Sequence, residues 1–122
     1  MKLYQDRIQD YYRRKPLAGK PEGTTNSAMA HNPLCGDVAI LHLIISNGVV
    51  IQAGVQAEGC VLSVAAAHMI AEQLVGKSLQ EIKSFDSAWV QQLIGLVLGP
   101  NRLRCATLSL ACIQSILKDT NA

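Results

Sequence analysis

Residues 38–57, VAILHLIISNGVVIQAGVQA, decide the fold. Two apolar runs rich in β-branched residues, 38–46 and 49–57, flank the dipeptide Asn47-Gly48. Asn-Gly between two such runs is the strongest short-range hairpin signal, because a type I′ turn needs a positive φ at both central positions. The sequence therefore predicts an antiparallel hairpin at the centre of the chain.

The two runs differ in how their side chains alternate. The second run places Ala53, Val55 and Ala57 on one side and glutamines on the other, which predicts one buried face. The first run is apolar on both sides, with Ile40 and Ile44 opposite its leucines. We expect either a helix or a partner to cover the second side, so the chain is expected to be a monomer or a weak homo-oligomer.

Helical patterns surround the hairpin. We expect helices over residues 3–14, 61–75, 87–98 and 105–118, and a short one after the capping box that Ser78 and Glu81 form. A Pro- and Gly-containing connector spans 16–34 and includes a short edge strand near 26–30. The expected fold class is α+β, a small antiparallel sheet of about three strands with helices packed on it.

Size and composition restrict the function classes. The 122 residues suit a single domain, 1–122, and the 49% apolar content allows a core made largely of aliphatic side chains. A net charge of +2 does not indicate nucleic acid. The sequence has no apolar run long enough for a membrane span and no signal-peptide pattern, so we expect a cytoplasmic protein.

The chain has four cysteines, which in a reducing compartment indicate metal binding or reactivity rather than disulfides. Cys35 precedes a predicted strand, Cys60 follows Gly59 at a strand–helix junction, and Cys105 is placed at the start of the last predicted helix. Helix N-termini lower the pKa of a thiol, which favours the metal-binding thiolate. Cys112 lies two turns further along that helix and is interpreted as a core residue.

Asp37 stands two residues after Cys35, so three thiols and one carboxylate could form a single site. Zinc accepts such a set, and thiolate-rich sites also suit iron–sulfur clusters. A carboxylate should hold a cluster less tightly than a thiolate, which would suit a site that releases what it holds. The alternative from spacing alone is three independent buried thiols, since the sequence has no C-x₂-C pair.

The motifs together resemble the iron–sulfur cluster assembly scaffolds of the IscU/SufU/NifU N-terminal family. The matching stretches, in order along nearly the whole chain, are LYQDRIQDYY (3–12), NPLCGD (32–37), EGC (58–60), GKS (76–78) and RCATL (104–108). His31 before NPLCGD and Arg104 before Cys105 are closer to SufU. The short separation of Cys60 and Cys105 is similar to IscU, so the features are mixed.

The resemblance implies that Cys35, Asp37, Cys60 and Cys105 line one exposed site for a transient [2Fe–2S] cluster or Zn²⁺. It implies a PLP-dependent cysteine desulfurase and downstream apo iron–sulfur proteins as partners, with Cys35 as sulfur acceptor. Such a protein is a scaffold rather than an enzyme, although a SufU-type relative would be a zinc-dependent sulfur-transfer protein that activates a desulfurase.

Further residues have supporting or open roles. Gly36 and Gly59 would let the backbone approach the site closely. Arg104 is either a thiolate-stabilising cation or a surface charge, and His31 is either an alternative ligand or a plain loop residue. His42 and His68 are expected to be structural.

A rival hypothesis is a structural zinc module, in which the metal only holds the fold. Structural zinc sites are usually closed by four Cys or His ligands, so Asp37 in a glycine-flanked loop argues against this hypothesis.

Overall fold

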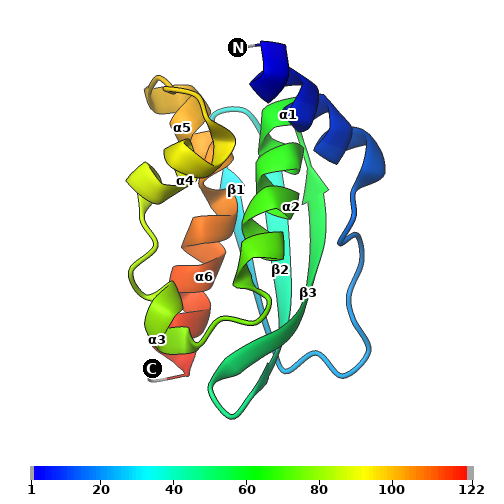
Figure 1. Ribbon diagram of the computed structural model, residues 1–122, viewed down its shortest axis with the longest axis vertical. Coiled ribbons are helices and arrows are strands. Elements are labelled where there is room, and N and C mark those ends of the chain that lie inside the picture. The colour runs from blue at the N-terminus through cyan, green and yellow to red at the C-terminus, as the bar shows by residue number, and fades with distance from the viewer. Residues whose placement is uncertain (1, 121–122) are drawn as a thin grey trace.

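The computed structural model describes residues 2–120 and has a three-stranded antiparallel sheet covered on one face by helices (Figure 1). Spatial strand order follows the chain, β1-β2-β3. The elements are α1 (Lys2–Arg14), β1 (Asn26–Asn32), β2 (Asp37–Ser46), β3 (Val49–Glu58), α2 (Val61–Leu74), α3 (Leu79–Ile82), α4 (Ser87–Ile94), α5 (Pro100–Ala106) and α6 (Leu108–Asp119). The predicted α+β class and the three-stranded sheet are confirmed.

The central hairpin has the predicted turn. Asn47 and Gly48 both adopt positive φ, 53° and 75°, as a type I′ turn requires. β2 and β3 pair antiparallel along their whole lengths, with a register shift between Ile44 and Ile45. This hairpin places Asp37 and Glu58 together at the end of the sheet opposite the turn.

The edge strand predicted near 26–30 is longer than expected. β1 pairs with β2 in register from Asn26 with Leu43 to Asn32 with Asp37. The chain then reverses through residues 33–36, so Cys35 lies in a tight β1–β2 turn rather than at the end of a long free loop.

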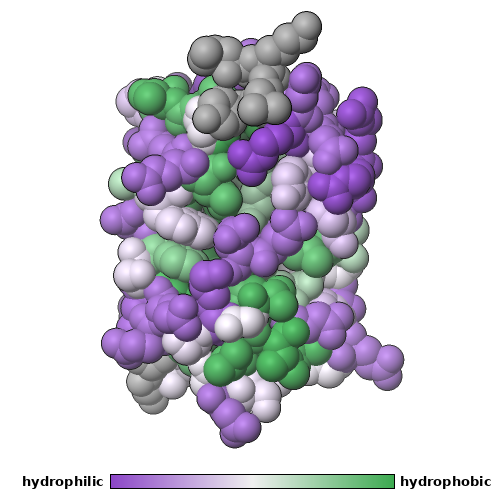
Figure 2. All heavy atoms as spheres, viewed as in Figure 1, coloured by the Kyte–Doolittle hydropathy of each residue, from purple (hydrophilic) through white to green (hydrophobic). Residues whose placement is uncertain are grey.

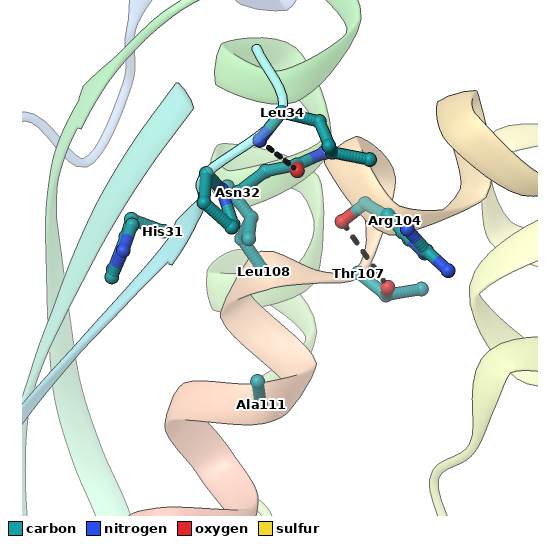
Figure 3. Close-up of a pocket in the computed structure, with 8 residues that line it drawn as sticks. His31, Asn32, Leu34, Arg104, Thr107, Leu108 and Ala111 are labelled. Carbon is teal, nitrogen blue, oxygen red and sulfur yellow. Dashed lines mark hydrogen bonds between the residues drawn. The ribbon is translucent and has the colours of Figure 1, made fainter. Parts of the chain in front are cut away.

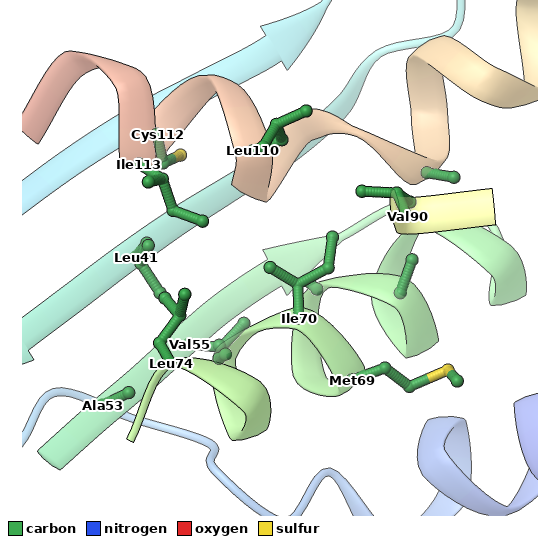
Figure 4. Close-up of a cluster of buried hydrophobic side chains, with 14 of the residues drawn as sticks. Leu41, Ala53, Val55, Met69, Ile70, Leu74, Val90, Leu110, Cys112 and Ile113 are labelled. Carbon is green, nitrogen blue, oxygen red and sulfur yellow. The ribbon is translucent and has the colours of Figure 1, made fainter. Parts of the chain in front are cut away.

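The inner face of the sheet packs against α2 and α6, and Figure 4 shows the resulting core. Leu41, Ile70 and Leu74 are fully buried there. Burial of one such side chain stabilises the fold by about 1.5–3 kcal/mol. Cys112 is also fully buried, as predicted, and burial raises the pKa of its thiol to about 11.

The outer face of β2 is covered in part by the connector rather than by a helix. Ala18 bridges to Val55 on the edge of β3, and a Cβ at Gly54 would overlap the carbonyl of Gly19. His42 lies buried on this face, with its ring nitrogens hydrogen-bonded to Ser27 and Gln56 at 2.6 Å each. The connector therefore covers this face near Gly54 and Ile44, while Ile40 stays partly exposed.

Two contacts fasten α1 and the connector to α2. The Tyr11 hydroxyl donates to Glu72 at 2.5 Å. The backbone N–H of Leu17 donates to Nδ1 of His68 at 3.2 Å. His68 is buried, and burial lowers its pKa to about 4, so the ring is neutral and accepts this hydrogen bond. The structural role expected for His68 is thus to hold the connector.

The predicted helix boundaries were wrong in the last third of the chain. The helix expected over 87–98 ends at Ile94, because Gly95 adopts a left-handed φ of 84° and its N–H bonds back to Gln91. The helix expected to start at Cys105 is two helices. Pro100 begins α5, where proline fits the first turn, and a break at Thr107 separates α5 from α6.

The surface seen in Figure 2 is mainly hydrophilic, with a hydrophobic patch in its lower part, where the end of α2 and the β2–β3 turn lie. Ile51 and Val75 are the large apolar side chains exposed in these segments. Among residues 2–120, no helix is both long and apolar enough to cross a lipid bilayer.

Candidate metal centre

Three segments meet at the end of the sheet opposite the Asn47-Gly48 turn. They are the β1–β2 turn with Cys35, the junction of β3 and α2 with Cys60, and the last turn of α5 with Cys105. Since Asp37 begins β2 beside all three, the fold gathers the four predicted site residues in one region.

Cys35 occupies the tip of the β1–β2 turn and is exposed to solvent. Its backbone N–H and that of Gly36 both donate to the carbonyl of Asn32, at 3.3 and 2.8 Å. Gly36 has a φ of +76°, which a glycine adopts without strain. The turn therefore holds an exposed thiol at a defined place beside the strand ends.

Asp37 is buried, with 3% of its surface exposed, and this differs from the glycine-flanked loop position expected. The backbone N–H of Cys60 donates to its Oδ1 at 3.3 Å. Burial alone would raise the pKa of Asp37. Hydrogen bonds from the Cys105 thiol, the Cys60 N–H and the other two thiols outweigh burial and lower that pKa. The site thus contains a carboxylate that is ionised and fixed in place.

Gly59 allows the β3–α2 junction to approach the side chain of Asp37 closely. Its φ is +142°, and a Cβ built on it would overlap the carboxylate of Asp37. Side chains rarely adopt such a φ, and here one would also displace the acid. Glycine is therefore required at position 59 for two reasons: the positive φ, and the lack of room for a Cβ beside the Asp37 carboxylate.

Cys60 is the N-cap of α2. Its Sγ accepts a hydrogen bond from the backbone N–H of Ser63 at 3.4 Å and lies 3.5 Å from Oδ2 of Asp37. The Cys60 side chain is exposed. The thiol at the helix N-terminus, predicted from the sequence, is present here.

The sequence predicted Cys105 at a helix N-terminus, and this was wrong. Cys105 lies in the last turn of α5, with 8% of its surface exposed. Burial, then hydrogen bonds with Asp37 and Cys35, raise the pKa of the Cys105 thiol to about 12. The expected lowering of its pKa is therefore wrong in the metal-free protein. A bound cation would supply the positive charge that stabilises the thiolate.

The ligand atoms of Cys35, Asp37 and Cys105 all lie within 4.8 Å of one another. The two Sγ atoms are 3.3 Å apart. Such a set of thiols and one carboxylate fits zinc or iron chemistry. Cys60 lies outside this group of three but contacts Asp37, so it is placed to supply a further thiol.

A pocket of about 340 Å³ lies against the site (Figure 3). In this view His31 lies to one side of Leu108 and Arg104 to the other, with Ala111 below them. Both His31 and Arg104 are exposed. In the part of the chain that the structure describes, no hydrogen bond or ion pair joins the Arg104 guanidinium to a thiol, which favours the surface-charge interpretation.

Sequence reasoning missed Asn32. Its side chain is buried, donates from Nδ2 to the Sγ of Cys105 at 3.6 Å, and accepts at Oδ1 from the N–H of Leu34 at 3.0 Å. The Asn-Pro dipeptide was a usable signal, because asparagine side chains often bond the backbone two residues on in turns.

Comparisons with known proteins show which family the chain is similar to. Residues 3–121 match the family described as "NifU-like N terminal domain". A relative from Thermotoga maritima named "Iron-sulfur cluster assembly scaffold protein IscU" is 35% identical over 67% of this chain and 58% of its own length. A protein of the same name from Haemophilus influenzae is 27% identical over 98% of this chain and 96% of its own.

Another relative carries a different name. The "Zinc-dependent sulfurtransferase SufU" of Bacillus subtilis is 26% identical over 92% of this chain and 87% of its own. Among solved structures, a putative scaffold protein for the SUF system from Fervidobacterium islandicum superposes with a TM-score of 0.78 at 23% identity, covering 92% of this chain and 94% of that one. These matches, with the family match across nearly the whole sequence, show that the chain belongs to the family of NifU-like N-terminal domains.

Proposed function

We propose that the chain acts as one domain that accepts sulfur from a cysteine desulfurase and assembles a labile [2Fe–2S] cluster for transfer to apo proteins. The observation that carries the proposal is the group of Cys35, Asp37 and Cys105, with ligand atoms within 4.8 Å and one thiol exposed. Buried donors hold a metal, while an exposed thiol gives a partner access. The relatives named IscU support the same function.

Cys35 is the proposed sulfur acceptor, because its exposed thiol stands at the tip of a turn, whereas the exposed thiol of Cys60 contacts Asp37 and the N–H of Ser63. Its thiolate attacks the terminal sulfur of a persulfide on the desulfurase. A new S–S bond forms at Cys35, the donor's S–S bond breaks, and the donor cysteine leaves as a thiolate. The Sγ of Cys105, 3.3 Å from that of Cys35, would hold a metal ion next to the transferred sulfur, which stays bonded to Cys35.

The bound zinc ion or cluster is called the cargo below. Cys35, Asp37 and Cys105 would hold it, with Cys60 as the fourth donor after its Sγ leaves the N–H of Ser63. Asp37 is the proposed labile ligand, because a carboxylate oxygen binds a cluster iron less tightly than a thiolate does. Gly36 and Gly59 support the site through the turn and the close approach described above.

A zinc-dependent sulfur-transfer role is the second candidate. The Bacillus subtilis relative named as a zinc-dependent sulfurtransferase favours it. The compact set of two thiols and one carboxylate also favours this role, because a zinc ion takes four ligands. Of the ligands in this set, the exposed Cys35 would be the one that can exchange.

A purely structural zinc role has less support. The core consists of apolar side chains between the sheet, α2 and α6, and the candidate ligands lie at one end of the sheet. Folding of such a core does not require a metal, in contrast to small domains that are unfolded without zinc.

The test is sulfur transfer from the cognate desulfurase, supplied with cysteine, to the purified protein. We expect mass spectrometry to find one additional sulfur atom on the peptide containing Cys35, and Cys35→Ser to lose both this product and the stimulation of the desulfurase. Full stimulation by Cys35→Ser would remove Cys35 as the acceptor. Cys112→Ala is the matched control, because that thiol is fully buried.

A further inference from the structure

We propose that Asn32 is a positioning residue that sets the spacing of Cys35 and Cys105 and donates a hydrogen bond to the Cys105 sulfur while the cargo is bound. The part that concerns the cargo rests on the function proposed above. The part that concerns the spacing of the two thiols applies to the metal-free protein as well.

Asn32 accepts the hydrogen bonds of the β1–β2 turn. Pro33 has no N–H, and the three remaining turn residues, 34–36, all donate their N–H groups to Asn32. Leu34 bonds to the side-chain Oδ1 at 3.0 Å, whereas Cys35 and Gly36 bond to the backbone carbonyl at 3.3 and 2.8 Å. One residue therefore determines where the Cys35 thiol stands.

The side-chain amide of Asn32 has a defined orientation. Because the N–H of Leu34 requires an acceptor, Oδ1 must face it, and Nδ2 must then face the other way. Nδ2 lies 3.6 Å from the Sγ of Cys105 in a buried position, with 5% of Asn32 exposed. The amide thus presents an N–H to sulfur and has no acceptor to repel a thiolate there.

Asn32 connects the β1–β2 turn to Cys105. Cys35 and Cys105 come from distant segments of the chain, yet their Sγ atoms are 3.3 Å apart. Asn32 contacts both sides, through its backbone carbonyl and Oδ1 to the Cys35 turn and through Nδ2 to Cys105. The Asn32 side chain thereby joins Leu34, next to Cys35 in the turn, to the Cys105 sulfur, and its backbone carbonyl holds the rest of the turn.

An N–H donor to a metal-bound sulfur keeps that ligand oriented and reduces the negative charge it carries. Outer partners of this kind typically change metal affinity by about 10- to 100-fold when they are removed. Hydrogen bonds to cluster sulfurs also tune the electronic properties of the site. The alternative is that Asn32 only shapes the turn, and in that case any residue that preserves the turn should serve as well.

Two variants separate these roles. Asn32→Ser keeps a side-chain oxygen for the N–H of Leu34 but is too short to reach Cys105. Asn32→Asp keeps the same oxygen and shape but turns an acceptor toward the sulfur instead of a donor. Asn26→Ser is the matched control, because Asn26 lies at the opposite end of β1 from Asn32. In the described structure, its Oδ1 accepts a hydrogen bond only from the hydroxyl of the neighbouring Thr25.

Zinc-loaded protein is mixed with a chromogenic chelator, and Co²⁺-loaded protein is examined by absorption spectroscopy. For both Asn32 variants we expect zinc release to be about 10-fold faster than for Asn26→Ser. The thiolate-to-cobalt charge-transfer band should shift, a spectroscopic change that a purely turn-shaping role would not produce. Thermal unfolding of the metal-free variants verifies that they are folded.

A measurement on the metal-free protein tests the spacing of the Cys35 and Cys105 thiols separately. Dibromobimane becomes fluorescent when it cross-links two adjacent thiols, and in a Cys60→Ser background the adjacent pair is Cys35 and Cys105. We expect slower cross-linking in Asn32→Ser. If wild-type protein bound no metal but Asn32→Ser still cross-linked slowly, the positioning role would stand and the proposed cargo would fail.

If both Asn32 variants matched Asn26→Ser within about twofold in metal release and in cross-linking, the positioning role of Asn32 would be overturned, because such outer partners normally contribute more.

Discussion

The backbone N–H of Cys60 donates a hydrogen bond to Oδ1 of Asp37 at 3.3 Å, which ties the start of β2 to the N-terminus of α2. The same carboxylate lies 3.5 Å from the Cys60 sulfur. Asp37 is therefore held by the helix end rather than by a flexible turn. Any cation that binds the carboxylate is brought close to two or more thiols.

Gly59→Ala should damage both stability and metal binding. The new Cβ would overlap the Asp37 carboxylate, and alanine is strained at a φ of +142°. We expect a loss of about 2–4 kcal/mol in the free energy of unfolding, measured by urea denaturation.

Gly48→Ala is the control for that experiment, because Gly48 also has a positive φ of +75° but open space around it. It should cost about 1 kcal/mol and leave zinc binding unchanged. Equal losses of zinc affinity in the two variants would mean that the contact between Gly59 and Asp37 has no special role.

Asp37→Ala should lengthen the lifetime of a reconstituted cluster in air. Removing the oxygen ligand takes away the weakest bond to the cluster and leaves the thiolates. The decay of the visible absorption band after exposure to air measures this lifetime. An unchanged or shorter lifetime would refute the role of Asp37 as the labile ligand.

The stability of the metal-free protein should fall between about pH 6.5 and pH 4 because of His68. Its pKa is lowered to about 4 in the fold, so below pH 6.5 the unfolded chain takes up this proton first and unfolding becomes favoured. The loss should approach about 3 kcal/mol across this range. Urea denaturation at a series of pH values measures it.

His68→Gln should flatten that pH dependence, since glutamine does not titrate in this range. Asp37 does not confuse the result, because its pKa is lowered from 3.8 and its contribution is lost only at more acidic pH. A slope that persists unchanged in His68→Gln would assign the effect to other groups.

Chelation should leave the fold intact. The core between the sheet, α2 and α6 does not include the candidate ligands Cys35 and Asp37. We expect the far-UV circular dichroism spectrum to be unchanged by EDTA, with a lower melting temperature, since a ligand of the folded state stabilises it by mass action. Collapse of the spectrum would instead support a structural zinc site.

Local signals in the sequence predicted much of this fold. The turn at Asn47-Gly48 and the capping box of Ser78 and Glu81 depend only on residues a few positions apart, and both are present. The helix expected to begin at Cys105 is preceded by α5, which begins at Pro100, because proline both ends helices and occupies their first turn and only the packing of α5 distinguishes the two cases. The position of Cys105 was wrong for the same reason.

The sequence predicted that the motif residues converge, but it did not predict how they are buried and bonded, and their role as ligands stays a prediction. The motif residues Cys35, Asp37 and Cys105 converge as expected. Their burial and the contacts of Asn32 depend on segments far apart in the chain, which no local pattern encodes. The elevated pKa of Cys105 follows from that burial and could not be derived from spacing.

The most direct test of the account is the content of metal and acid-labile sulfide in anaerobically purified protein, compared with Cys105→Ser and with the buried control Cys112→Ala. For the wild type and for Cys112→Ala, the account predicts either iron and sulfide in equal amounts or stoichiometric zinc. For Cys105→Ser, it predicts that the bound metal and any sulfide are lost. Wild-type protein with neither metal nor sulfide, or Cys105→Ser with the wild-type content, would contradict it.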